Sequence, residues 1–130
     1  MICTLKMSLR SLPLLFLALI SSCATTMKSS DLVGSKSFLI NEQQAKDICL
    51  QAMKFHFSEA KISEVLPPSI GYKARYTMLL DYLDISIVAL PSGDGYVFEM
   101  QTEGTAVVTG NSKAKSILKE AVALAQQKSR

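Results

Sequence analysis

The stretch LDISIVALPSGDGYVFEMQTE, residues 83–103, decides the fold class of this chain. Its two halves, 83–90 and 96–103, are rich in the apolar, β-branched and aromatic residues that favour strands. The segment between them, Pro91-Ser92-Gly93-Asp94-Gly95, has the composition of a tight turn. In the second half, alternate residues point to opposite faces of the strand. One face has Tyr96, Phe98 and Met100, and the other has Val97, Glu99 and Gln101. The stretch therefore predicts a β-hairpin.

Upstream of the hairpin, residues 70–78 show the same period of two and predict a half-buried strand. Residues 60–66 predict a further short strand, which Pro67 and Pro68 end. After a bend at Gly104, residues 105–109 are expected to extend the sheet. We therefore expect three or four antiparallel strands.

Two helices are predicted on either side of these strands. The first begins at Asn41, whose side chain can cap the helix with Gln44 as its reciprocal partner, and ends near 56–57. The second begins at 110–112. Each has an apolar stripe at helical spacing: Ala45, Ile48, Cys49, Ala52, Met53 and His56 in the first, and Ala114, Ile117, Leu118, Ala121, Val122 and Ala125 in the second.

The order of helix, strands and helix predicts an α+β fold over residues 38–130. Both apolar stripes must be buried, and one face of the sheet can bury both of them. We expect a two-layer sandwich with both helices on one sheet face and the other face partly in contact with water.

Residues 1–22 have the layout of a secretory signal peptide. Lys6 and Arg10 precede an apolar run of about nine residues, about 14 Å long as a helix, which is too short to span a bilayer core of about 30 Å. Met7 also begins a complete signal of this kind. Met7 is therefore an alternative to Met1 as the start of translation.

The end of this segment, Ile20-Ser21-Ser22-Cys23, resembles the lipobox of bacterial lipoproteins. The resemblance implies that Cys23 receives a diacylglyceryl group, that the chain is cut before it, and that the new amino terminus is acylated. Such a residue carries enough acyl chains for stable membrane anchoring. Since Ala24 rather than Asp follows, the resemblance implies the outer membrane, facing the periplasm. Ordinary secretion with cleavage near Ala24 and an uncleaved amphipathic anchor are the alternatives.

Residues 23–37 are rich in Ser, Thr and Lys and show no apolar period, so they predict a lipidated flexible tether. Thirteen extended residues reach at most about 43–47 Å. We therefore expect the domain to float near the membrane without touching it.

The charge balance argues against a nucleic-acid partner. Of 14 Lys and Arg residues, Lys6 and Arg10 belong to the signal, which leaves 12 against 11 Asp and Glu. A nucleic-acid-binding surface needs a clear basic excess. The net basic character of the whole chain thus comes mainly from its targeting segment.

The residues give no catalytic or metal-binding pattern. Cys49 and His56 share a helix face, but they lie about 10.5 Å apart along its axis, too far for a nucleophile and its base. One Cys and one His cannot supply a metal site, and the Gly93-Asp94-Gly95 segment is too sparse in Asp for calcium. Neither a phosphate-binding glycine loop nor a GxSxG motif occurs. We expect no enzyme activity, no cofactor and no metal.

Charged residues on the predicted strands form a candidate interaction surface. Lys73 and Arg75 share one strand, while Glu99 and Glu103 share another. They either make ordinary cross-strand charge pairs on the wet face or recognise another envelope protein. Tyr72 and Tyr76 are expected in the core rather than around a ligand.

Three functional hypotheses follow. The first is a non-enzymatic binding or assembly module of the cell envelope, anchored by lipid. The second is a carrier or chaperone for an apolar ligand such as lipid, held in a cavity that small core residues leave: Ala45, Ala52, Ala74, Ala121 and Ala125. The third is an envelope enzyme with unrecognised catalytic groups.

Overall fold

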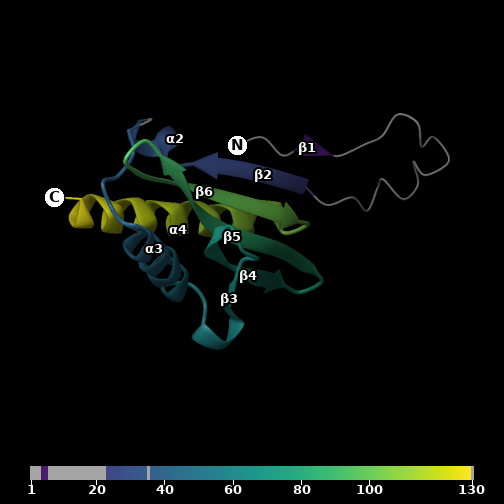
Figure 1. Cartoon of the computed structure of the whole chain (residues 1–130). Helices are drawn as coiled ribbons and strands as arrows, with labels where there is room; N and C mark the ends of the chain where they lie inside the picture. Colours follow the sequence, from purple (N-terminus) through teal and green to yellow (C-terminus); the bar gives the residue numbers. More distant parts are fainter. Residues whose placement is uncertain (1–3, 6–22, 35, 130) are drawn as a thin grey trace.

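The computed structural model describes residues 4–5, 23–34 and 36–129 of the 130-residue chain. The predicted signal peptide, with lipobox residues Ile20 to Ser22, lies outside the described residues except for Thr4 and Leu5. Figure 1 shows a sheet with the long helix α4 running along it.

The described strands form one sheet in which every neighbouring pair is antiparallel. In spatial order they are β1 (Thr4–Leu5), β2 (Cys23–Lys28), β6 (Gly95–Gly104), β5 (Asp81–Ser92), β4 (Ile70–Met78) and β3 (Ser63–Glu64). The predicted hairpin is β5–β6, and its turn is reduced to Gly93 and Asp94. The expected α+β sandwich is confirmed.

Two long helices, α3 (Glu42–Lys54) and α4 (Val107–Lys128), pack on one face of the sheet. Two shorter elements, α2 (Ser30–Val33) and the 3-10 helix η2 (Glu59–Lys61), lie in the connections. The predicted cap of α3 is confirmed, because Asn41 Oδ1 accepts the Gln44 N–H at 2.8 Å and Gln44 Oε1 accepts the Asn41 N–H at 3.0 Å. Both predicted helix stripes are buried, apart from half-buried His56.

The core lies between the helices and the inward positions of the sheet. Leu83, Ile85 and Ile87 of β5 alternate with less buried neighbours, as a strand with one covered face requires. The largest side chains with almost no exposure come from both layers: Phe98, Met53, Leu83, Ile85, Ile87, Met100, Ile117 and Leu118. This burial supplies the main driving force for folding.

The prediction that residues 105–109 extend the sheet is wrong, because α4 already begins at Val107. The backbone N–H groups of Thr105 and Ala106 both donate to the Tyr82 carbonyl at 2.8 Å, and Thr105 Oγ1 accepts the Tyr82 N–H at 3.2 Å. These bonds turn the chain off the sheet and into the helix layer. Gly110, which suggested a helix start, instead lies inside α4 where the helix passes closest to the Leu83 side chain.

The predicted tether over residues 23–37 is also wrong. β2 pairs with β6 over its whole length, from Cys23 opposite Gly104 to Lys28 opposite Glu99. The next residue, Ser29, is buried; its N–H donates to the Phe98 carbonyl at 2.8 Å and its hydroxyl accepts the Phe98 N–H at 3.0 Å. The sheet therefore includes residues 23–28, and the domain is not confined to residues from 38 onward.

The inward positions of β2 explain why the sequence looked like a tether. Thr25 and Ser29 are buried although both are polar, and between them Met27 is only partly buried. A strand whose inward residues are hydrogen-bonded rather than apolar shows no hydrophobic period of two. Nearby, the buried Thr102 hydroxyl donates to Asn111 Oδ1 at 3.0 Å and joins β6 to α4 in the same polar layer.

Candidate interaction surface

The sheet face opposite the helices, called here the open face, contains all four residues predicted for an interaction surface. The strand register defines it, because residues alternating with the buried set of β5 point away from the helices. Its polar positions are Thr26 and Lys28 of β2, Glu99, Gln101 and Glu103 of β6, Asp84 and Ser86 of β5, and Lys73 and Arg75 of β4. The structure thus brings the two predicted charge pairs onto one surface.

Arg75 is held in place by two neighbours on β5. Its Nε lies 2.7 Å from Asp84 Oδ1 and its Nη2 lies 3.1 Å from Asp84 Oδ2, a two-point contact. The centre of the guanidinium also lies 4.5 Å from the centroid of the Tyr82 ring. The hydrogen bond that Arg75 donates to Asp84, followed by the negative charge of Asp84, raises the pKa of Arg75. Arg75 therefore has a fixed position rather than a free one.

The predicted charge pairs do not pair with one another. β5 lies between β4 and β6, so Lys73 and Arg75 are at least two strand spacings, about 9.5 Å, from the Glu99 and Glu103 backbones. The partner of Arg75 is Asp84, which sequence reasoning did not single out. Aligning the alternation of residues 70–78 and 83–90 across their two-residue turn would have placed Asp84 opposite Arg75.

On the open face, the negative charges lie mainly on the central strands β5 and β6. Glu103 lies directly opposite Asp84, and Glu99 lies opposite Lys28 and accepts a hydrogen bond from the Gln101 amide at 3.1 Å. Lys73 lies opposite Ser86 and forms no ion pair with any residue that the structure describes. The centre of the face is therefore acidic, with Lys73 available at its β4 side.

A second charged cluster lies where α3 meets the edge of the sheet. Lys46 Nζ contacts Glu64 Oε1 at 2.9 Å, and the Tyr72 hydroxyl donates to the same oxygen at 3.4 Å. The hydrogen bond with Lys46 lowers the pKa of Glu64, and the same bond raises that of Lys46. Burial raises the pKa of Tyr72. All three groups serve to attach β3 to the helix layer.

Tyr72 and Tyr76 both pack against the core, as predicted. Tyr76 also forms one side of a cation–π arrangement. Lys113 Nζ lies 5.3 Å from the Tyr76 ring centroid and 5.4 Å from that of Phe57. The lysine thus joins the start of α4 to the end of β4 and to the segment after α3.

Cys49 and His56 occupy environments without catalytic features. Cys49 is completely buried, and burial raises the pKa of its thiol to about 12. His56 follows the C-terminus of α3 at Lys54; partial burial and then the charge of Lys113 lower its pKa. A thiol that is neutral and inaccessible cannot act as a nucleophile. Burial and the charge of Lys113 therefore both disfavour the charged form of His56.

The described residues form grooves at the surface of the domain. A groove of about 430 Å³ lies between β2, α2 and α4, lined by residues that include Met27, Leu32 and Leu118. The alanines that suggested an internal cavity do not line this groove or three other hollows that the described residues form. Within that part of the chain, no group of His, Cys, Asp and Glu could hold a metal ion, and no helix is long and apolar enough to cross a membrane.

The turn between β4 and β5 is apolar and fully exposed, and sequence reasoning missed it. Leu79 and Leu80 connect β4 to β5, and these two residues are 99% and 100% exposed. The sequence signal was present as two leucines between two predicted strands, where polar or glycine residues are usual.

The chain matches no family model, no curated protein and no solved structure.

Proposed function

We propose that this chain is a non-enzymatic binding or assembly module of the bacterial cell envelope, anchored through lipid on Cys23. The lipobox Ile20-Ser21-Ser22-Cys23 supports the anchor, and by the same resemblance the outer membrane, facing the periplasm, is its location. The partner is another protein of the envelope, bound through the open face.

The open face is the observation that carries this proposal. It presents charges from neighbouring strands on a rigid sheet, and the helices in the described part of the chain pack on the other side. Arg75 is already ordered by Asp84 and Tyr82, so little side-chain freedom is lost when it contacts a partner. Lys73 offers an exposed ammonium beside the acidic centre. A partner with a complementary arrangement of charge would be selected by these groups.

The position of Cys23 changes how the anchor works in this proposal. Because Cys23 is the first residue of β2, no tether separates the lipid from the domain. The sheet would therefore lie directly at the membrane surface, and the open face would meet partners that also lie close to it.

Site-specific photo-crosslinking in cells tests the interaction. A photoreactive amino acid at Ser86, in the middle of the open face, is expected to give a discrete protein adduct, which Lys73→Glu or Glu99→Lys weakens severalfold. Lys119→Glu, on the exposed side of α4, is the matched control and should leave the adduct unchanged. An adduct that survives both open-face substitutions would rule out recognition through this surface.

The apolar-carrier hypothesis receives less support than the binding module. The alanines that suggested a cavity are packed with almost no exposure among larger side chains of the core. Close-packed interiors leave little space for a lipid chain without rearrangement.

A further inference from the structure

The hairpin between β4 and β5 ends in two leucines whose side chains contact almost nothing. Leu79 and Leu80 are 99% and 100% exposed, whereas the other sheet hairpin turns through Gly93 and Asp94. Leu79 also has a φ of 53°, in the left-handed region that a bulky side chain rarely adopts. Asn or Gly at position 79 would adopt this φ more readily than leucine. Leucines are apolar, so they are poorly suited to full exposure to water, and Leu79 is poorly suited to its left-handed backbone conformation. Residues kept under both disadvantages indicate a role in binding rather than in stabilising the fold.

This tip lies at the same end of the sheet as Cys23. The register places Cys23, Gly104, Leu83 and Tyr76 in one row across β2, β6, β5 and β4. From that row β4 continues for three residues to reach Leu79, which at about 3.3 Å per residue is about 10 Å. Figure 1 shows the start of β2 and the turn between β4 and β5 at the same end of the molecule.

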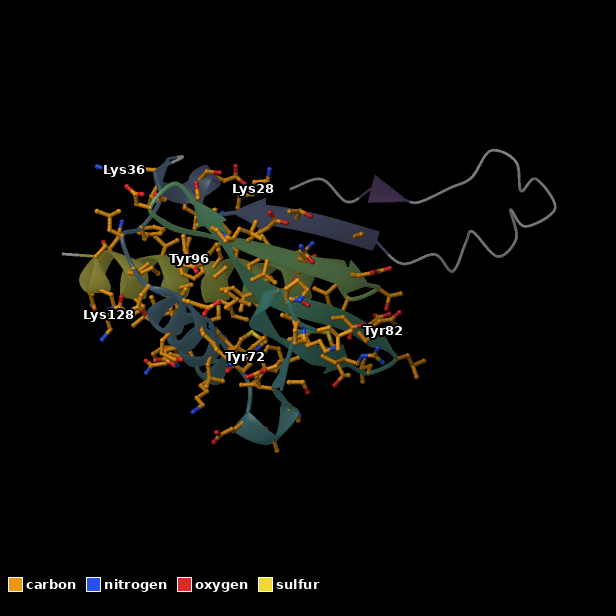
Figure 2. All side chains as sticks on the ribbon, viewed as in Figure 1. Lys28, Lys36, Tyr72, Tyr82, Tyr96 and Lys128 are labelled. Carbon is orange, nitrogen blue, oxygen red and sulfur yellow. The ribbon has the colours of Figure 1, made fainter. Side chains whose placement is uncertain are left out.

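The residues behind the tip fit the boundary between lipid and water. Tyr82, labelled in Figure 2, lies on the open face next to the turn, and half-buried Tyr76 lies on the helix side one row further back. Tyrosines are enriched at this boundary, because the ring prefers the apolar side and the hydroxyl prefers water. Two acidic residues, Asp81 and Glu103, are exposed at the same end. Arg75 is paired with Asp84, and Lys113 beside Tyr76 offsets only one of the two acids, so the remaining negative charge favours a zwitterionic surface over an anionic one.

We propose that the Leu79–Leu80 tip inserts into the zwitterionic membrane that holds the acyl chains of Cys23. This inference rests on the proposed lipid anchor. A projection of about 10 Å beyond the Cys23 row matches the depth of about 5–10 Å to which apolar side chains of interfacial proteins enter a membrane.

The lipid and the tip have separate tasks in this arrangement. The acyl chains keep the domain at the surface, and this high local concentration lets a weak contact by two leucines persist. Two attachment points, on β2 and on the β4–β5 turn, then fix the sheet with its strands steep to the membrane. The open face is thereby turned sideways, toward partners on the same membrane, instead of toward the lipid.

Fluorescence of the full lipidated protein in vesicles of phosphatidylethanolamine and phosphatidylcholine tests the contact. An environment-sensitive dye is attached to Leu80→Cys, since Cys23 would be blocked by lipid and Cys49 is buried. We expect a blue-shifted emission and at least a twofold quenching by nitroxide-labelled lipid. The matched control, a dye on Asp94→Cys at the opposite end of the sheet, should emit as in water and remain unquenched.

A second variant keeps the turn but removes the leucines. Leu79→Asn combined with Leu80→Gly should preserve the fold, and a dye on Thr77→Cys should lose its quenching by nitroxide lipid in this background. Water-like emission at position 80, or quenching at position 77 that survives the Asn-Gly turn, overturns the insertion.

Mass spectrometry of the same sample distinguishes a failure of tip insertion from a failure of the proposed lipid anchor on Cys23. An acylated Cys23 with a water-exposed tip leaves the lipid anchor standing and removes only the insertion. A Cys23 without acyl chains removes both. A tip that crosslinks to a protein and shows no lipid quenching would mean that the leucines bind a protein, which also overturns the proposal.

Discussion

Arg75 and Asp84 form a two-point ion pair across the β4–β5 ladder, with the guanidinium above the Tyr82 ring. The carboxylate of Asp84 also lies in the same row as Glu103 on β6. Arg75 therefore offsets the repulsion between two neighbouring acids as well as binding one of them. Removing the arginine should expose that repulsion.

Accordingly, Arg75→Gln should lower the melting temperature slightly, and Arg75→Gln with Glu103→Gln should recover part of the loss. The effect should shrink in high salt, because exposed charges are screened. Thermal melts at low and high ionic strength measure it. Equal losses in the single and double variants would show that Glu103 does not sense Arg75.

Ser29 gives a test of the β2 strand. Ser29→Ala leaves the buried Phe98 N–H without its acceptor, which should cost about 1–3 kcal/mol of the free energy of unfolding. Urea denaturation measures this, with Ser30→Ala as the control at the adjacent, partly exposed position. A flexible tether over 23–37 would instead make Ser29→Ala neutral.

Cys49 should resist thiol reagents in the folded protein. Its thiol is buried and has a pKa of about 12, so the reactive thiolate is almost absent at neutral pH. In a Cys3→Ser, Cys23→Ser variant, an aromatic disulfide reagent should modify Cys49 only as rapidly as the domain unfolds. Prompt modification in native buffer would contradict the buried position.

His56 should make the domain less stable in mild acid. Its pKa is lowered in the folded state, so the unfolded chain binds the proton more tightly and stability falls as the pH drops below about 6.5. Lys113 strengthens this effect and Glu120 opposes it.

In His56→Gln, the fall in melting temperature between pH 7.5 and pH 5 should be smaller than in the parent chain. Glu64 does not interfere, because its lowered pKa places its own contribution at more acidic pH. A pH profile identical in both proteins would show that another group controls this range.

The elements that sequence reasoning predicted well are those with a strong hydrophobic period. Ile48 and Met53 of α3, and Ile85 and Phe98 of the hairpin, are buried as predicted because apolar side chains at periods of 3.6 and two mark the covered face. The Asn41 cap is likewise local, since both of its partners lie within four positions. Such features need no knowledge of distant residues.

The errors arose where contacts between residues far apart in the sequence determine the secondary structure. β2 is specified by hydrogen bonds of Thr25 and Ser29 with β6, which no local pattern reveals. The start of α4 depends on Tyr82, more than twenty positions earlier. In the candidate surface, the four charged residues were found by composition, but their common face and the role of Asp84 required the strand register.

The pairing of β2 with β6 sets the order in which this protein can mature. Cys23 is paired with Gly104, so the sheet cannot close until the segment holding β6 is available. In a chain exported from its amino terminus first, β2 crosses the membrane early. It then stays unpaired with β6, its main partner, until most of the domain has been exported. Contacts between such distant segments form slowly. Under the proposed lipid anchor, this delay would leave Cys23 accessible for acylation before folding draws its backbone into the sheet.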